Sequence, residues 1–187
     1  MTDKLIEITT NLKEALEKNR SSIHLKTKHI DKSFFHEKYK KDANITAESF
    51  FLEFNDIKSP VLYWFEINTT KVSKEAIRNK YEGFLENNKL NLDTYRNPSA
   101  IKIDYSKAEN TLYVGKVKNG FWGRLVTHLG YNTSRKTAGM QLFYWYDIEQ
   151  FGDLTLNYVV LNREMENLVA VLEVELAKEL KPLIGRY

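Results

Sequence analysis

Apolar residues recur with helical spacing in three long stretches of the chain. In each stretch they fall every three or four residues and leave the charged residues on the opposite side, which is typical of an amphipathic helix. Ser73 and Asn162 stand where a helix cap is expected, just before the second and third stretches. A shorter helix is predicted to end at Gly130, because glycine readily takes the left-handed conformation that closes a helix. The predicted helices cover 3–19, 47–54, 73–87, 121–129 and 163–180.

Five other stretches are rich in apolar, aromatic and β-branched residues and predict strands. The run PVLYWFEI over 60–67 is apolar along most of its length, which indicates a buried strand. The stretches 100–105 and 111–117 are predicted to form a hairpin, and 140–147 is predicted to pair with 154–161. Together these elements predict an α+β fold, in which helices flank a small and mainly antiparallel sheet.

A polar stretch between Asn87 and Ser99 is the expected domain boundary. It separates residues 1–95 from residues 96–187. We predict the first part to be an α/β extension that selects or grips a substrate, and the second part to be the domain that carries the chemistry. The chain shows no internal repeat and no low-complexity segment.

The composition excludes several classes of protein. The chain has 187 residues, of which 42% are hydrophobic, and this is enough for a folded core. It has no cysteine, so disulfides, thiol nucleophiles and zinc–thiolate sites are excluded. No apolar run reaches the roughly 18–20 residues that span a bilayer, and the N-terminus resembles neither a signal peptide nor a transit peptide. We therefore expect a cytoplasmic protein without a membrane partner.

The formal net charge of +3 is too small to indicate a nucleic-acid-binding protein, but basic residues gather in one segment. Between His24 and Lys41, lysines and histidines alternate with Phe34, Phe35 and Tyr39. Basic residues beside exposed aromatic rings suit a nucleic-acid strand, because they bind its phosphates and its bases. The alternative, which we favour, is a solvated lysine-rich surface that is anchored by core aromatics.

The stretch from Thr111 to Gly130 carries the clearest candidate site. Tyr113 lies on a predicted strand, and Arg124 and His128 are four residues apart on the helix that follows. Residues with this spacing share one face of a helix. A tyrosine, an arginine and a histidine in this arrangement suit the binding of an anion.

The same stretch resembles the GIY-YIG family of nucleases. The triplet Tyr113-Val114-Gly115 is similar to the second half of the family signature, and Arg124 and His128 fit the strand, turn and helix arrangement of the family. The resemblance covers residues 98–187. It implies a GIY-YIG-like fold for this part of the chain and the activity of a metal-dependent endonuclease.

A second match to the family lies near the C-terminus, where Glu173 precedes Pro182 by nine residues. The resemblance implies that Glu173 binds Mg²⁺ (or Mn²⁺), an ion that suits one carboxylate because it keeps most of its waters. It implies that Arg124 stabilises the charge of the transition state. Tyr113 would orient or deprotonate the attacking water, and His128 would contact the phosphate or relay a proton. The basic residues expected to contact nucleic acid are Lys38, Lys40, Lys41, Lys116, Arg135 and Lys136.

The first half of the family signature is where this sequence departs from the pattern. Counting back eleven residues from Tyr113 gives Ala100-Ile101-Lys102, where the family has a tyrosine in place of the lysine. In an antiparallel hairpin Lys102 shares a face with Tyr113, whereas Tyr105 falls on the core face. We therefore predict that Lys102 takes the tyrosine's place and binds the phosphate, lowers the pKa of Tyr113 or acts as a base. The alternatives are a degenerate site and an ordinary surface lysine.

Three hypotheses of function follow from these observations. The first is an endonuclease that hydrolyses DNA, with RNA not excluded as the substrate. The second is a catalytically inactive nucleic-acid-binding protein of the same fold. The third is a protein-interaction module, in which the aromatic runs LFYWYDI and VLYWFEI form the face of a homodimer.

Overall fold

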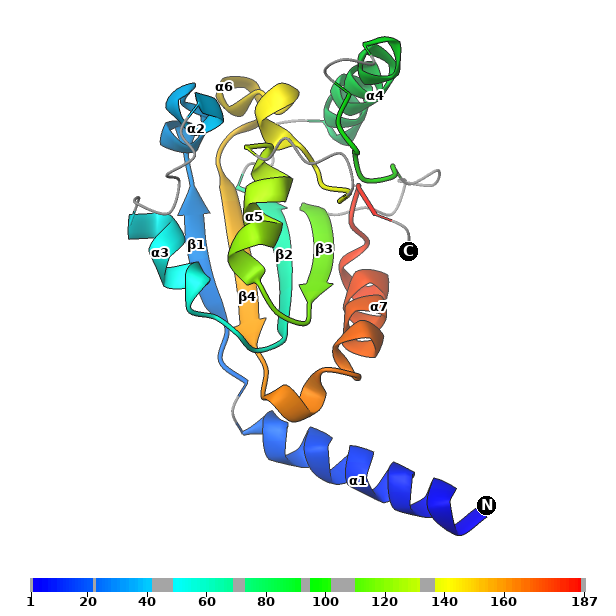
Figure 1. The fold of residues 1–187 in the computed structure, drawn as a ribbon. Coiled ribbons are helices and arrows are strands. Elements are labelled where there is room, and N and C mark those ends of the chain that lie inside the picture. Colours follow the sequence, from blue (N-terminus) through cyan, green and yellow to red (C-terminus); the bar gives the residue numbers. More distant parts are fainter. Residues whose placement is uncertain are drawn as a thin grey trace.

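A four-stranded antiparallel sheet in the order β1-β4-β2-β3 forms the centre of the fold (Figure 1). Its strands are β1 (Lys26–Ile30), β2 (Val61–Ile67), β3 (Thr111–Val117) and β4 (Leu154–Val160). The structure is a computed structural model, and it describes residues 2–21, 23–41, 49–68, 73–91, 95–101, 110–131 and 137–185. Helices flank the sheet, so the predicted α+β fold with a small antiparallel sheet is confirmed.

Seven α-helices and three short 3-10 turns lie within the described residues. The helices are α1 (Thr2–Arg20), α2 (Lys38–Lys41), α3 (Ser49–Asn55), α4 (Lys74–Leu90), α5 (Phe121–Leu129), α6 (Ile148–Phe151) and α7 (Val169–Leu180). The 3-10 turns are η1 (Lys32–Phe35), η4 (Leu142–Tyr144) and η5 (Arg163–Met165). Among the described residues, no helix is long and apolar enough to cross a membrane.

The caps explain why several helices begin and end as predicted. The Ser73 hydroxyl accepts a hydrogen bond from the amide of Ala76 at the start of α4, which is the usual role of an N-cap serine. Gly130 ends α5 in the left-handed region, with φ of 93°. The last helix begins later than predicted, because the chain after Asn162 first forms η5 and a turn before α7 starts at Val169.

The apolar strand β2 lies inside the sheet, between β4 and β3. Val61, Tyr63, Phe65 and Ile67 are buried on the face that α5 covers, and the alternate residues are half-buried on the other face. A strand that is apolar on both faces is most stable in such an interior position. Strands from both sides of the boundary predicted near residue 95 therefore form one sheet, and a division of function between the two parts stays a prediction.

The predicted pairing of 100–105 with 111–117 is not the pairing that β3 makes in the structure. The strand β3 pairs with β2, in a register that places Tyr63 opposite Gly115 and Phe65 opposite Tyr113. On its other edge β3 contacts the segment after α7, since the amide of Ile184 donates to the carbonyl of Leu112 at 2.9 Å. Ile101 forms a bridge with Ile184, and residues 102–109 lie outside the described part of the chain. The long apolar β2 thus takes the position that the sequence analysis gave to 100–105.

The predicted strand over 140–147 is wrong. This stretch forms η4 and leads into α6, and Gln141 has a positive φ of 59° that interrupts an extended strand. Its aromatic residues pack into the core instead: the rings of Trp145 and Tyr81 are 4.7 Å apart between centroids. The strand β4 accordingly pairs with β2 and β1. The strand β1 was not predicted, because its lysines mask the strand pattern; such lysines are common on edge strands.

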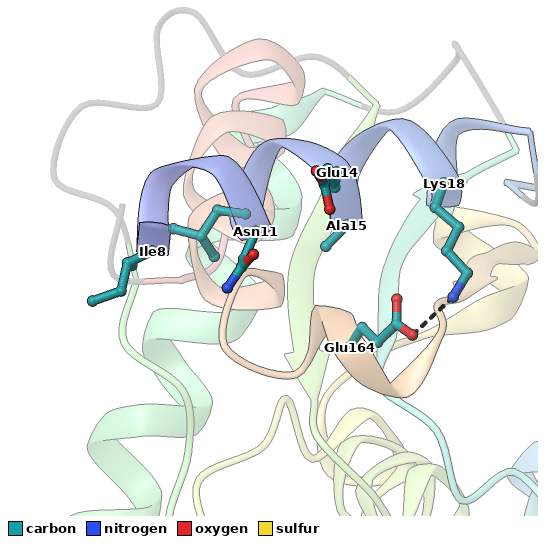
Figure 2. A pocket seen from close by; sticks show the side chains of 7 residues that line it. Ile8, Asn11, Glu14, Ala15, Lys18 and Glu164 are labelled. Carbon is teal, nitrogen blue, oxygen red and sulfur yellow. Dashed lines mark hydrogen bonds and ion pairs between the residues drawn. The ribbon is translucent and has the colours of Figure 1, made fainter. Parts of the chain in front are cut away.

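The helix α1 is attached to the rest of the molecule through its C-terminal end. Asn19 is 1% exposed, and its side-chain oxygen accepts a hydrogen bond from the amide of Asn162 at 3.1 Å. Lys18 forms an ion pair with Glu164 at 2.9 Å, shown by the dashed line in Figure 2. The N-terminal half of α1 extends away from the sheet (Figure 1) and carries exposed apolar side chains.

Candidate functional site

Four side chains from three elements meet between the sheet and α5. They are Tyr63 on β2, Tyr113 on β3, and Arg124 and His128 on α5. The Arg124 guanidinium donates from Nε to the Tyr63 hydroxyl at 3.1 Å and from Nη2 to the Tyr113 hydroxyl at 3.2 Å. The Tyr63 hydroxyl lies 2.8 Å from His128 Nε2. The structure thus brings together three residues that the sequence selected, and it adds Tyr63.

Local structure fixes the direction of the two side chains from α5. Arg124 and His128 are one helical turn apart and point from the same face of α5 toward β2 and β3. The third arm of the guanidinium, Nη1, donates to the carbonyl of Ala138 at 2.5 Å. Three oxygen atoms around one planar group hold Arg124 in a single orientation.

His128 is a neutral imidazole with a defined tautomer. It is 0% exposed, and the amide of Met140 donates to its Nδ1 at 3.2 Å. Because Nδ1 accepts, the ring proton is on Nε2, which donates to the Tyr63 hydroxyl. Burial, and next the charge of Arg124, lower the pKa of His128 well below its usual range. The histidine therefore stays uncharged at neutral pH.

The two tyrosine hydroxyls differ in what they accept. Burial is the largest cause that raises the pKa of Tyr63 and of Tyr113, and Arg124 opposes the rise in both. The Tyr63 oxygen accepts from His128 and Arg124, and its own hydrogen bond to Tyr113 lowers the pKa of Tyr113. The hydrogen bonds therefore run from His128 through Tyr63 toward Tyr113, whose oxygen is the one best placed to carry negative charge.

Arg124 keeps its positive charge in this site. Burial by itself lowers the pKa of the guanidinium. The two tyrosines outweigh that effect through charge interaction and hydrogen bonds, so the pKa of Arg124 rises above its usual value. A permanent cation that is mostly screened from water interacts strongly with an anion placed beside it.

Gly115 leaves the space that the two tyrosine rings occupy. A Cβ atom at this position would lie 2.5 Å from Tyr113 Cε1 and 2.6 Å from the Tyr63 hydroxyl oxygen. Both distances are far below van der Waals contact. The glycine of the Tyr113-Val114-Gly115 triplet is therefore required by the packing of the site.

Replacing Gly115 by alanine is expected to lower the free energy of unfolding by about 1–3 kcal/mol, because the new methyl group displaces buried rings. Denaturant unfolding of the variant measures this change. Gly123→Ala on α5 is the matched control, since nothing lies within 4 Å of a Cβ placed there. An alanine at 115 that unfolds like the unaltered protein would contradict the crowding that the structure shows.

Glu173 provides a carboxylate close to this group of side chains. It lies on α7, is half-buried, and its charge raises the pKa of both Tyr63 and Tyr113. α7 ends at Leu180, and after Pro182 the chain runs along the edge of β3, which holds α7 beside that strand. Glu173 makes no hydrogen bond or ion pair with any other described residue.

The donor atoms suit a hard cation held by one carboxylate. Within the described part of the chain, no group of three or more histidine, aspartate or glutamate side chains forms a metal site. A single carboxylate near an arginine is a different arrangement, and Mg²⁺ is commonly bound through only one or two carboxylates while it keeps several waters. Glu173 fits that arrangement because its carboxylate has no competing cation partner among the described residues.

Lys102 lies outside the described residues, and the place next to Tyr113 that we predicted for it is taken by Tyr63. The two tyrosine rings are stacked, with 6.3 Å between their centroids. The sequence signal for a second tyrosine beside Tyr113 was the triplet Val61-Leu62-Tyr63, at the start of an apolar strand. It was missed because α4 separates β2 from β3 in the sequence, although the two strands pair in the sheet.

Of the predicted nucleic-acid-binding residues, only Lys38 and Lys116 have described side chains, and neither lies among the side chains of this site. Lys116 alternates with Gly115 on β3, so its side chain lies on the face of the sheet opposite Tyr113. Lys38 is exposed on α2, with Nζ 4.9 Å from the centre of the Tyr39 ring. The side chains of Lys40 and Lys41, and the whole of Arg135 and Lys136, lie outside the described residues.

The aromatic residues of the basic segment point into the core. Tyr39 is stacked on Tyr131 with 5.1 Å between centroids, and Phe35 is stacked on Phe143 at 6.3 Å. These two rings thus anchor the segment to the core, which agrees with the interpretation of 24–41 as a lysine-rich surface that core aromatics hold in place.

Comparison of the chain with models of known protein families, with curated proteins and with solved structures found no match in any of the three.

Proposed function

We propose that this protein is an endonuclease that hydrolyses phosphodiester bonds of DNA in a metal-dependent reaction. The observation that carries the proposal is one charged, half-buried arginine that donates to two tyrosine hydroxyls near the carboxylate of Glu173, which has no partner among the described residues. Hydrolysis of a phosphodiester requires a cation for the charge that develops on phosphorus and a group that activates water. In the proposed reaction a water molecule is the nucleophile, and the residues of the site activate it.

Each residue of the site has a role in this reaction. Arg124 binds the phosphate and stabilises its charge in the transition state, because its planar donors already point into the site. Arg124 favours the phenolate form of Tyr113, whose oxygen accepts the proton of the attacking water and becomes the neutral hydroxyl. Tyr63 and His128 orient Tyr113 and complete the path along which a proton moves. Mg²⁺ or Mn²⁺ bound through Glu173 supplies the Lewis acid that such a reaction requires.

The site also supports the proposed relation to the GIY-YIG family. That family has two signature tyrosines on neighbouring strands, and Tyr63 is the second tyrosine that the sequence analysis did not find. Gly115, which the two rings require, is the glycine of the second triplet. Because Tyr63 occupies this place, the proposal does not depend on Lys102.

The second candidate is a catalytically inactive nucleic-acid-binding protein of the same fold. The observation in its favour is that Arg124 is engaged by three oxygens of the protein itself, one of them the carbonyl of Ala138. The homodimer formed by the aromatic runs has less support, since VLYWFEI is an interior strand and Trp145 and Tyr146 are buried in the core. For either nucleic-acid function we expect a cytoplasmic protein.

The test of the proposal is cleavage of supercoiled plasmid DNA. We expect nicked and then linear plasmid with Mg²⁺ or Mn²⁺, and intact plasmid when a chelator is present. Single-stranded DNA and RNA are offered in parallel, because they identify which nucleic acid is the substrate. Binding of these nucleic acids without any cleavage, with either metal, would establish the inactive protein instead.

A further inference from the structure

A groove runs between α4 and the segment 143–148, at the same end of the molecule as α6 (Figure 1). Its narrower part has a volume of about 320 Å³ and is lined by Tyr144 and Trp145 on one side and by residues of α4 on the other. A wider part of about 750 Å³ continues past Lys80 toward η1. Both volumes lie in the range of cavities that bind small planar molecules.

The wall that α4 contributes has an unusual composition. Asn79, Gly83 and Asn87 are spaced four residues apart, so they form one line along the helix with a glycine between two amides. Both amide side chains are exposed, and neither makes a hydrogen bond with another described residue. Lys80 is exposed beside them and has no ion-pair partner among the described residues.

Gly83 is not explained by packing within the protein. Glycine in the middle of a helix is destabilising relative to alanine, because it loses more backbone freedom on folding. A Cβ atom at Gly83 would meet nothing within 4 Å. Because Gly83 has no side chain, the narrower part of the groove stays open at this position of α4.

The wall formed by Tyr144 and Trp145 is held in place by contacts outside the groove. The Arg96 guanidinium lies 4.0 Å from the centre of the Tyr144 ring, and Arg96 lines neither part of the groove. Trp145 is fixed through its indole nitrogen, which donates to the carbonyl of Met140 at 2.8 Å. Trp145 is 4% exposed, so the half-buried ring of Tyr144 supplies the surface on which a planar ring stacks. A fixed ring suits such stacking, because little freedom is lost on binding.

The groove is connected to the site around Arg124 by one residue. Tyr81, next to Lys80 on α4, packs against Trp145, and its hydroxyl donates to the carbonyl of Ser99 at 2.6 Å. Tyr81 is also near enough to Tyr113 for the charge of that residue to act on it. Tyr81 is buried, so it joins the two places through the core of the protein.

We propose that this groove binds an unpaired nucleobase of the nucleic acid that the protein cleaves. The inference rests on the proposed function. The base stacks on the ring of Tyr144, and its polar atoms bond to the amides of Asn79 and Asn87, which both donate and accept. Lys80 binds the adjoining phosphate. The preferred substrate is accordingly a duplex with a bulged or extruded base, because a paired base cannot reach such a pocket.

The test measures binding without metal, so that it does not depend on cleavage. The probes are a DNA duplex with a single bulged 2-aminopurine, the same duplex fully paired, and free adenosine monophosphate. The principal variant is Gly83→Met, whose Cβ atom meets nothing within 4 Å and whose longer side chain is meant to fill the narrow part of the groove. The control is Glu75→Met on the same helix, at an exposed position that lines neither part of the groove. Gly83→Ala, expected to unfold at a higher temperature than the unaltered protein, tests whether packing requires the glycine.

We expect Gly83→Met to bind the bulged duplex about tenfold or more weakly, which is the effect of losing one stacked base. Its affinity for the paired duplex stays as in Glu75→Met, and quenching of 2-aminopurine fluorescence is lost. Asn87→Leu, which removes one amide and keeps the volume, lowers the affinity for the bulge in the same direction. The proposal would be overturned if Gly83→Met bound the bulged and the paired duplex equally more weakly. It would also be overturned if Gly83→Met bound the bulged duplex as tightly as the unaltered protein does. Binding of adenosine monophosphate as tight as that of the bulge would assign the groove to a free nucleotide instead.

The two proposals fail in different ways. Loss of bulge binding in Gly83→Met, in a protein that cleaves no nucleic acid, supports the groove and contradicts the nuclease. If the protein cleaves plasmid, and Gly83→Met changes neither its cleavage nor its binding of bulged and paired duplexes, the nuclease is supported and the groove is contradicted.

Discussion

Arg124→Lys is expected to leave the protein folded and to slow cleavage of DNA on the order of a hundredfold or more. The guanidinium donates to Tyr63, to Tyr113 and to the carbonyl of Ala138 from three different nitrogens of one plane. A lysine has one nitrogen, which cannot reach all three oxygens and bind two phosphate oxygens in the same geometry. Transition-state stabilisation is therefore lost although the positive charge remains.

The kinetic pattern distinguishes this role from a structural one. The turnover number is expected to fall, while the affinity for DNA in the absence of metal changes little, because the interaction is strongest in the transition state. Thermal unfolding of the variant shows whether it is folded. Arg78→Lys is the control, since Arg78 is paired with Glu82 at 2.8 Å on the surface of α4. An Arg124→Lys protein that cleaves within about twofold of the unaltered rate would remove Arg124 from the reaction.

Glu173→Gln is expected to abolish metal-dependent cleavage and to retain the fold and the affinity for DNA. The substitution is nearly isosteric, but it removes the negative charge that holds a hard cation. Cleavage measured over a range of Mg²⁺ concentrations, together with calorimetric titration of the metal, checks the loss. Glu175→Gln is the matched control on the same helix, because Glu175 is exposed and paired with Lys178 at 2.6 Å.

The same variant separates a role in metal binding from an effect on Tyr113. The charge of Glu173 raises the pKa of Tyr113, so its removal moves that pKa down, toward the usual value for tyrosine. A Tyr113 that acts as the base is then deprotonated at lower pH, and the rate at neutral pH rises. Only the loss of a bound metal lowers the rate, so a Glu173→Gln protein as active as the unaltered one, or more active, would show that Glu173 is not the metal ligand.

Local sequence signals predicted much of the site correctly. The spacing of Arg124 and His128 on one turn of helix is a property of the helix alone, and so is the end of that helix at Gly130. The alternation along 111–117 placed Tyr113 on a strand with Gly115 two residues later, on the same face. These features depend on neighbours within a few residues, which the sequence displays directly.

Pairing between strands was decided by the tertiary structure. The hairpin over 100–117 was predicted because its two stretches are close in sequence. In the structure β3 pairs with β2, although α4 lies between the two strands in the sequence. The free energy of that pairing comes from burying an apolar strand on both faces, and no local pattern indicates which partner it takes. For the same reason no local pattern pointed to Tyr63, and Lys102 lies outside the described residues.

The sequence by itself determined most of the long helices, the strands β2, β3 and β4, the α+β class, and Tyr113, Arg124 and His128 among the four residues that meet, because periodicity, caps and turn residues act over short distances. Only the tertiary structure decided that Tyr63 completes the group, that the aromatic run over 140–147 folds into turns, and that Gly83 faces an open groove. Each of these depends on which distant surfaces are buried together. Burial is a property of the whole packed chain, and an apolar stretch of sequence does not specify what it packs against.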